Sequence, residues 1–220
     1  MTMVNNEIAR YNMIEQQIRP WDVMDDQVLD LLVQLPREDF VPEAYKAMAF
    51  MDMPLPLGHD QCMMPPKLEA RILQALALQP HETILEIGTG SGYFTALLAR
   101  SCAHVYSVEL YADLSEQAQQ NLEEHHIHNV SLEVGDAAQG WSQHDRVDAI
   151  VITAALPVLP DQFRQDLKVG GRMIAIIGDS PSMEVQLIHR TGERDWTTEN
   201  LFETDMPCLV NARQPERFVL

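Results

Sequence analysis

"TILEIGTGSGYF", residues 83–94, is the stretch from which the rest of the chain is best interpreted. An apolar run ends in an acid, and Gly88, Gly90 and Gly92 then alternate with small polar residues before an aromatic pair. This order indicates a strand, a glycine-rich loop and the start of a helix, as in nucleotide-type binding turns. A close-packed turn between a strand and a helix would also use glycine, so that alternative stays open.

The spacing of the loop argues against two common phosphate-binding motifs. The dinucleotide fingerprint is G-x-G-x-x-G, whereas the third glycine here comes one residue early. A P-loop needs a lysine and a hydroxyl residue after its last glycine, where this chain has Tyr93 and Phe94. We expect Glu86 to lie near the ligand, where it would repel a pyrophosphate but attract the ammonium and sulfonium of S-adenosylmethionine. The carboxylate of that cofactor can face N–H groups at the start of the helix.

Two further acids support S-adenosylmethionine as the ligand. Glu109 ends the next strand-like run, where ribose hydroxyls are held in folds of this type. Asp136 ends the run after that, where it can accept a hydrogen bond from the adenine amino group. A single acid at a strand end is more often a solvated cap. At matching ends of neighbouring strands, however, the two acids point to one crevice at the carboxyl edge of the sheet.

After residue 80 the sequence alternates between strand-like and helix-like runs. The strand-like runs are 83–88, 104–110, 129–135, 147–154 and 171–178, and the helix-like runs are 92–102, 111–126 and 157–169. Short β-rich runs separated by helices predict an α/β fold with a mostly parallel sheet and helices on both faces. Residues 183–205 predict two more strands around a turn at Thr191 and Gly192.

The chain before residue 80 is predicted to be mainly helical. Ile8, Met13 and Ile18 are expected to lie near one face of a first helix. Asp25 is a typical N-cap for a second helix, which stops at Pro36. These helices form an N-terminal extension of the α/β core.

We expect one domain over residues 1–220. Within it, 1–79 would supply the N-terminal helices and the substrate loop, and 80–220 the cofactor-binding core. The Met- and Pro-rich segment 50–66 is expected to be an ordered loop, followed by an amphipathic helix over 67–78.

Charge and composition exclude several classes of partner. The chain has 15 Lys and Arg against 33 Asp and Glu, a net charge of −18, and no basic run, which argues against nucleic acid as a partner. "ITAALP" also offers no aromatic clamp for a flipped base. The sequence has no apolar run long enough for a membrane span and no signal peptide pattern at its N-terminus.

The cysteines and histidines point to a reduced chain without a metal. Cys62, Cys102 and Cys208 lie far apart, which predicts a cytoplasmic protein with neither disulfides nor a zinc site. The cluster of histidines at 125, 126 and 128 is better explained by caps and loops than by metal binding.

The motifs together resemble the protein-L-isoaspartate (D-aspartate) O-methyltransferase family. The resemblance is carried by "ILEIGTGSGYFTALLA", by the upstream run "FVPEAYKAMAFMDMPLPLG", and by "NVSLEVGD", "VDAIVITAALP" and "LKVGGRMIAIIG" downstream. It implies a Rossmann-like class I methyltransferase with a seven-stranded sheet whose last strand is antiparallel. It also implies S-adenosylmethionine as cofactor, S-adenosylhomocysteine as product, and methylation of isoaspartyl carboxylates in damaged proteins. We therefore expect the cofactor to contact Glu86, Gly88, Thr89, Gly90, Gly92, Glu109, Leu110, Asp136 and Ala137.

The substrate loop departs from the family pattern, which runs roughly G-x-G-Q-T-I-S-x-P. This chain reads "GHDQCMMPP", so that Asp60 replaces a glycine, Cys62 the threonine and Met64 the serine. The loop residues expected at the substrate are Gly58, His59, Gln61 and Pro66. Cys62 and Met64 stand at the hydroxyl positions beside the reacting groups, and a methionine cannot donate a hydrogen bond to a carboxylate. Two alternatives therefore stay open: a small-molecule substrate, or a cofactor-binding protein without isoaspartyl activity.

Overall fold

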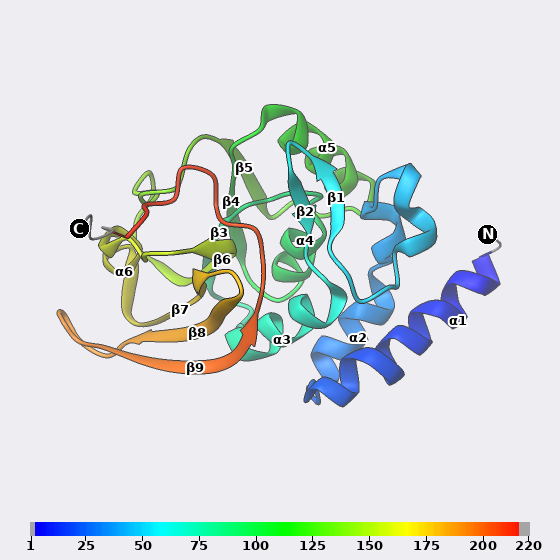
Figure 1. Cartoon of the computed structure of the whole chain (residues 1–220), viewed down its shortest axis with the longest axis horizontal. Coiled ribbons are helices and arrows are strands. Elements are labelled where there is room, and N and C mark those ends of the chain that lie inside the picture. Colours follow the sequence, from blue (N-terminus) through cyan, green and yellow to red (C-terminus); the bar gives the residue numbers. More distant parts are fainter. Residues whose placement is uncertain (1–2, 216–220) are drawn as a thin grey trace.

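A seven-stranded sheet with helices on both faces forms the centre of the computed structural model, which describes residues 3–215 (Figure 1). The strand order is β5-β4-β3-β6-β7-β8-β9. The strands of this sheet are β3 (Thr83–Ile87), β4 (His104–Glu109), β5 (Val130–Val134), β6 (Val147–Leu156), β7 (Leu167–Asp179), β8 (Ser182–Arg190) and β9 (Trp196–Thr204). The α-helices are α1 (Met3–Met13), α2 (Asp26–Gln34), α3 (Pro66–Leu76), α4 (Tyr93–Ala99), α5 (Ala112–Glu124) and α6 (Asp161–Gln165).

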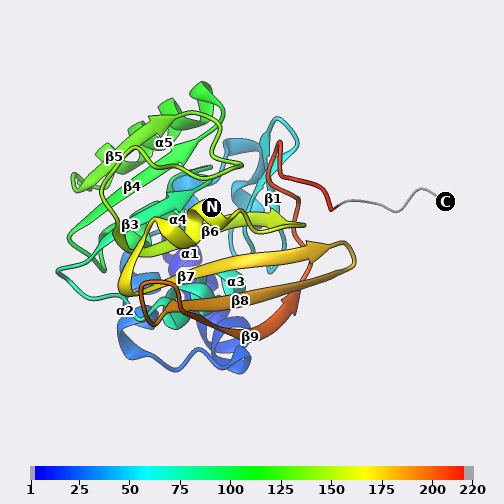
Figure 2. The ribbon, with the colours of Figure 1, turned by 90° about the vertical axis from the view of Figure 1, so that its left-hand side faces the viewer.

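The direction of the strands corrects one expectation. Strands β5, β4, β3, β6 and β7 are parallel, β8 is antiparallel to β7, and β9 is antiparallel to β8. The reversed strand is therefore the second to last, and the expectation of an antiparallel last strand is wrong. Tight connections explain this, because a hairpin pairs each strand with its chain neighbour in the opposite direction. The predicted turn at Thr191 is confirmed, since its N–H bonds to the Asp195 carbonyl at 2.9 Å. Figure 2 shows β7, β8 and β9 side by side.

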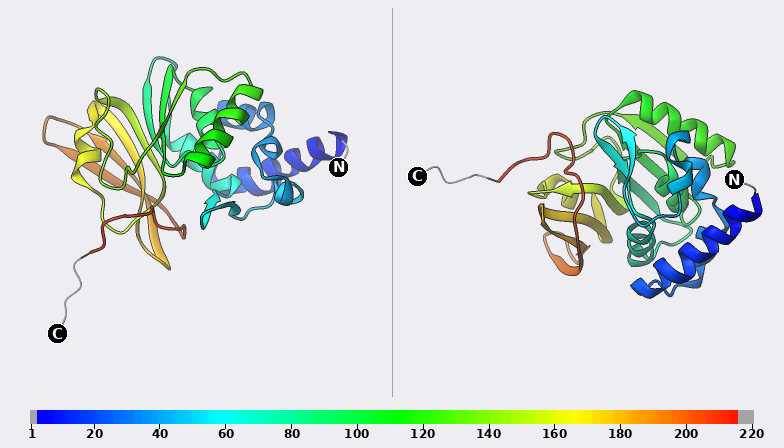
Figure 3. Two further views of the ribbon diagram at one scale, coloured as in Figure 1. Left: turned by 90° about the horizontal axis from the view of Figure 1, so that it is seen from above. Right: turned by 45° about the vertical axis from the view of Figure 1, so that its right-hand side comes forward.

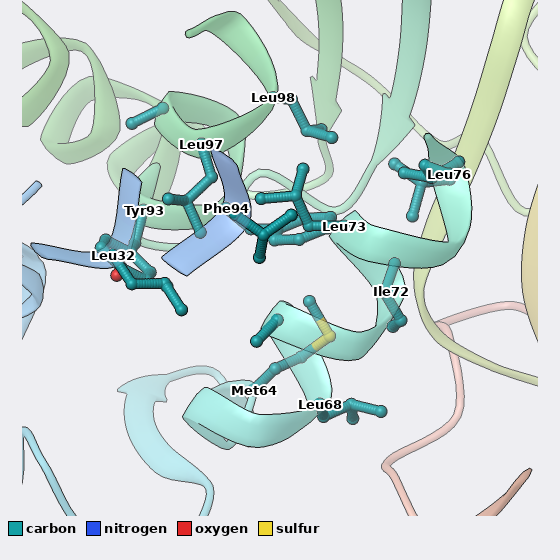
Figure 4. Close-up of a cluster of buried hydrophobic side chains, with 14 of the residues drawn as sticks. Leu32, Met64, Leu68, Ile72, Leu73, Leu76, Tyr93, Phe94, Leu97 and Leu98 are labelled. Carbon is teal, nitrogen blue, oxygen red and sulfur yellow. The ribbon is translucent and has the colours of Figure 1, made fainter. Parts of the chain in front are cut away.

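The central strands are buried on both faces, because successive side chains point to opposite sides of the sheet. Val151 belongs to the cluster shared with the N-terminal helices, whereas its neighbours Ile150 and Ile152 belong to the cluster on the other face. Helices α2, α3 and α4 contribute to the first cluster, part of which is shown in Figure 4. The N-terminal helices and the sheet thus share one hydrophobic core.

The N-terminal segment follows the sequence expectation except at one residue. Asp25 caps α2 by accepting hydrogen bonds from the N–H groups of Gln27 at 2.8 Å and Val28 at 3.4 Å. Met13 and Ile18 are buried, but Ile8 is 56% exposed. The chain changes from α1 to a π-helix, η1 (Ile14–Ile18), and the wider turn alters which residues share a face. Helix α1 also reaches beyond the body of the protein (Figure 3), so its first turns have little to pack against.

Three short 3-10 segments, η2 (Arg19–Trp21), η3 (Arg37–Phe40) and η4 (Glu43–Met48), complete the N-terminal part. In the core, α6 is shorter than the predicted helix at 157–169, because the chain already enters β7 at Leu167. Among residues 3–215, no helix combines the length and apolarity needed to cross a membrane.

The segment expected to be a loop at 50–66 contains a β-hairpin. Its strands are β1 (Leu55–Gly58) and β2 (Gln61–Met63), joined by His59 and Asp60, which both have positive φ of 51° and 57°. Two left-handed residues make the type of turn that matches the twist of a hairpin. Aspartate enters the left-handed region more easily than most residues, which explains how Asp60 can replace the glycine of the family pattern.

Candidate active site

A cavity opens at the carboxyl ends of the parallel strands, with about 860 Å³ of empty space when the open solvent at its mouth is included. This is the edge at which open α/β sheets bind ligands. Hairpin β1–β2 and the segment after β9 border the same cavity. Its lining comes from Leu57, 61–64, Glu69, 87–91, Phe94, 108–111, 135–138, 153–154, 206–207 and 209–210.

The glycine loop is fixed against the end of β6. Gly88 has φ of +95°, and a Cβ atom there would lie 2.3 Å from Thr153 Oγ1. The Thr153 hydroxyl lies 2.9 Å from the carbonyl oxygens of Ile87 and Gly88, to which it can donate. Thr89 lines the cavity and shares a 2.6 Å hydrogen bond with Ser107. The loop therefore requires glycine at position 88, and it presents a rigid backbone to the cavity.

Gly92 does not line the cavity, although it belongs to the expected set. It has φ of +80° and precedes α4, and a Cβ atom there would lie 3.1 Å from the Cβ of Ala118 in α5. Its position allows α4 and α5 to approach each other closely, which is a packing role.

Glu109 is held rigidly at the cavity wall at the end of β4. It is 5% exposed, and its carboxylate accepts hydrogen bonds from the N–H groups of Gly90 at 2.9 Å and Tyr111 at 3.1 Å. The carboxylate thus bridges the glycine loop and the start of α5. Leu110 lies beside it in the cavity lining.

Asp136 also lines the cavity, just after β5, the neighbouring strand of β4. Its Oδ1 accepts a hydrogen bond from the Ala138 N–H at 2.9 Å, and its Oδ2 accepts one from Asn211 Nδ2 at 2.8 Å. Ala137 lines the cavity next to it. Asn211 was missed in the sequence analysis, because it belongs to a segment after the last strand that returns to pair at Cys208 with Ala155. No local pattern marks that return.

Glu86 does not lie in the cavity, which corrects the expectation that it faces the ligand. It is fully buried beneath the loop, where its Oε2 accepts hydrogen bonds from Thr95 at 2.5 Å and Ser107 at 2.6 Å. Burial raises its pKa to about 8, although the two hydroxyls favour the ionised form. The acid before the glycines is therefore mostly neutral near pH 7, and Glu109 supplies the carboxylate that lies beside the glycine loop at the cavity wall.

The hairpin brings part of the expected substrate loop to the cavity. Gln61, Cys62 and Met64 line it, whereas Gly58, His59 and Pro66 do not. Met64 is 4% exposed and also belongs to the hydrophobic cluster of Figure 4. Burial raises the pKa of the Cys62 thiol, which disfavours the reactive thiolate form.

His59 fastens the tip of the hairpin to α5. Its ring stacks on Tyr111 with ring centroids 4.0 Å apart, and its Nε2 lies 2.8 Å from Asp113 Oδ2. The contact holds the hairpin beside the glycine loop, so His59 positions the cavity wall without lining it.

A buried ion pair at the hairpin end of the cavity was missed in the sequence analysis. Glu69 in α3 lines the cavity and is 1% exposed, and its carboxylate pairs with the fully buried Arg37. Burial raises the pKa of Glu69 to about 7, an effect that Arg37 opposes. One signal existed: Glu69 shares the apolar face of its helix with Leu73 and Leu76, at spacings of four and seven residues.

The histidine cluster shows packing contacts. The ring of His125 stacks on Phe40 with centroids 4.8 Å apart, and the rings of His126 and His128 are 6.5 Å apart. Across residues 3–215, no three His, Cys, Asp or Glu side chains are grouped in a way that could hold a metal ion.

The seven-stranded sheet, the glycine loop after β3 and the acids after β4 and β5 define a class I methyltransferase. Residues 9–213 match the protein family described as Protein-L-isoaspartate(D-aspartate) O-methyltransferase (PCMT). The chain belongs to this family, and it is an O-methyltransferase that depends on S-adenosylmethionine.

Curated relatives agree over nearly the whole chain. Protein-L-isoaspartate O-methyltransferase 2 of Pelobacter propionicus is 38% identical over 209 residues, covering 94% of this chain and 93% of its own. Protein-L-isoaspartate O-methyltransferase of Syntrophotalea carbinolica is 36% identical, covering 92% of this chain and 94% of its own. A crystal structure from Plasmodium falciparum, a putative protein of the same type in complex with S-adenosylhomocysteine, shares the fold. Its TM-score is 0.76 at 19% identity, covering 93% of this chain and 97% of that one.

Proposed function

We propose that this enzyme methylates the free carboxylate of isoaspartyl residues in proteins and peptides. The observation that carries the proposal is the extent of the family match, which covers residues 9–213. The match includes the N-terminal helices and the hairpin that border the cavity, as well as the cofactor core that all class I methyltransferases share. Two curated relatives whose names state this activity are 38% and 36% identical to the chain.

For the cofactor, we propose a position along the cavity from the glycine loop to Asp136. The residues fit S-adenosylmethionine, since the backbone at 88–90 is open to a ligand and Glu109 is a fixed acceptor suited to ribose hydroxyls. Asp136 and Ala137 would contact the edge of the adenine, and Leu110 would pack against its ring. Glu86 and Gly92 then act through the position of the loop and not by contact.

For the reaction, we propose that the protein orients the two reactants and excludes water. The cofactor supplies a methyl group on a positively charged sulfur. A substrate carboxylate is already ionised at pH 7, with an ordinary pKa near 4, so no general base is needed. Alignment and a dry site then supply the acceleration. Gln61, Cys62 and Met64 line the hairpin end of the cavity, where the substrate would enter.

The test is methyl transfer from labelled S-adenosylmethionine to two synthetic peptides that differ only in one isoaspartyl or one ordinary aspartyl residue. We expect base-labile methyl groups on the isoaspartyl peptide alone. Equal labelling of both peptides, or no labelling of either by a protein that binds S-adenosylhomocysteine, would overturn the proposal and favour a small-molecule substrate or a non-catalytic role.

The charge and the cysteines extend the proposal to partners and location. A net charge of −18 disfavours nucleic acid as a partner, so we propose that the macromolecular substrates are proteins or peptides. Cys62, Cys102 and Cys208 are all free thiols, and we place the enzyme in the reducing cytoplasm.

A further inference from the structure

We propose that Glu69 binds the substrate: a proton on its Oε1 is donated in a hydrogen bond to the isoaspartyl carboxylate. This role rests on the proposed function. Glu69 would supply the hydrogen bond to the substrate carboxylate that hydroxyl side chains at positions 62 and 64 would otherwise donate. This role makes Glu69 a catalytic residue of this chain in the sense that it touches the reacting group.

The first support is the position of the Glu69 carboxyl. It lies in the cavity lining with Met63, Met64 and Phe94, at the hairpin end. Arg37 bonds to its Oε2, and within residues 3–215 every hydrogen bond to this carboxyl ends on that oxygen. Since the side chain faces the cavity, Oε1 is left for a ligand.

The second support is the rigidity of the pair. Arg37 donates from Nε to the Ala49 carbonyl at 2.9 Å and from Nη2 to the Met64 carbonyl at 2.7 Å, and its guanidinium lies 5.1 Å from the centre of the Tyr93 ring. The guanidinium therefore has a single position, and it fixes the carboxyl in turn. A hydrogen-bonding group that is already fixed in this way loses little conformational entropy when the substrate binds.

The third support is the shortage of other donors at this end. Met64 has no donor and Cys62 has only a weak one. The Gln61 amide donates to the His59 carbonyl at 3.1 Å, and Phe94 has no polar group. Of the cavity-lining side chains on the hairpin, α3 and α4, Gln61 keeps one amide N–H free, and Glu69 is the buried group, fixed by Arg37, that can donate strongly when protonated.

The charges around Glu69 favour proton uptake when the substrate binds. Without substrate, ionised Glu69 and Arg37 form a neutral pair. An arriving carboxylate adds a negative charge, and two neighbouring carboxylates hold one proton between them while Arg37 balances the remaining charge. Burial already raises the pKa of Glu69 to about 7.

The other titratable groups facing this end do not supply that proton. Tyr93 from α4 and Glu86 from β3 are both buried with raised pKa values and are neutral near pH 7. Cys62 from β2 has a raised pKa as well. Glu109 from β4 accepts hydrogen bonds from two backbone N–H groups. One proton therefore comes from solvent on binding and returns to solvent when the neutral ester leaves.

The main test measures protons directly. An isoaspartyl peptide is titrated calorimetrically into the protein saturated with S-adenosylhomocysteine, at pH 8, in buffers of different ionisation enthalpy. The titration is repeated with Glu86→Gln, because Glu86, with its pKa of about 8, is partly ionised at this pH. We expect the wild type to take up close to one proton per peptide. Glu69→Gln should take up none and bind within about threefold of the wild type, because its amide still donates. Glu69→Val should bind at least about tenfold more weakly.

A matched control uses a second buried Glu–Arg pair, Glu82 with Arg172. Glu82 is bonded by Arg172 at 2.7 and 2.8 Å and does not line the cavity, so Glu82→Gln should keep the proton uptake of the wild type. In turnover, kcat/KM of the wild type should fall about tenfold per pH unit above the pKa of Glu69 in the free enzyme, which is about 7, whereas Glu69→Gln should be flat from pH 6.5 to 9.

Several results would overturn the assignment. The first is a wild type that takes up no proton on binding the peptide, and the second is a Glu69→Gln variant that still takes one up. The third is turnover that rises with pH and is lost in Glu69→Gln, because Glu69 would then act as an ionised acceptor. If Glu69→Val does not fold, as judged by circular dichroism, the glutamine variant decides. A wild type that methylates no isoaspartyl peptide at any pH refutes the proposed function, whereas turnover with identical pH profiles in both proteins refutes only the role of Glu69.

Discussion

Glu86 gives the protein a stability that falls as pH rises, and Glu86→Gln should remove this dependence. The folded-state pKa of about 8 lies above the ordinary value of 4.5, so the native state holds a proton that the unfolded chain releases. The contribution of this group is fully present below pH 4.5 and is lost as pH rises towards 8. Linkage gives a loss of about 2.5 kcal/mol from pH 5 to 7 and about 1.4 kcal/mol more by pH 9.

The glutamine variant keeps the acceptor for Thr95 and Ser107 but cannot ionise. The difference in unfolding free energy between wild type and variant should therefore shift in favour of the variant by these amounts, as measured by urea denaturation at pH 5, 7 and 9. Glu82→Gln is the control. Burial alone would raise the pKa of Glu82, but the bonds from Arg172 lower it, so this control should show a constant difference over the same range. A constant difference for Glu86→Gln as well would refute the buried, protonated state.

Three further predictions concern the cavity and its walls. Glu109→Ala should weaken S-adenosylhomocysteine binding by about 1–3 kcal/mol in calorimetric titration, the scale of lost hydrogen bonds to a charged group, and unchanged affinity would remove Glu109 from the cofactor site. Met64→Ser should lower the free energy of unfolding by about 2–4 kcal/mol in urea denaturation, because it empties a buried position, and a neutral effect would place Met64 outside the core. His59→Ala should loosen the hairpin and speed hydrogen exchange of the Met63 amide, because the ring contact with Tyr111 is lost. The amides of β3 are the control and should exchange as in the wild type. Equal protection of Met63 in both proteins would show that the contact with Tyr111 does not hold the hairpin.

Local patterns in the sequence were sufficient for the core of the fold. The alternation of strand-like and helix-like runs predicted the five parallel strands, and the side chain of Asp25 predicted the start of α2. The sequence placed Glu109 and Asp136 in one cavity because Glu109 ends β4 and Asp136 follows β5, and the ends of parallel strands meet at one edge of the sheet. In each case the signal lies within a few residues of the feature it predicts.

The tertiary structure decided which charged side chains face the cavity and which lie beneath it. Glu86 lies near the end of β3 much as Glu109 ends β4, but it shares the sheet face of Ile84 and is covered by Thr95 from α4. Arg37 and Glu69 are 32 residues apart, and Asn211 reaches Asp136 across 75 residues. Local periodicity shows which face of an element is apolar, but the burial, partner and protonation of a charged side chain depend on the distant segment that packs over it. For that reason the sequence by itself predicted that Glu109 and Asp136 line one crevice at the carboxyl edge of the sheet, while the acid proposed to bind the substrate emerged only from the folded chain.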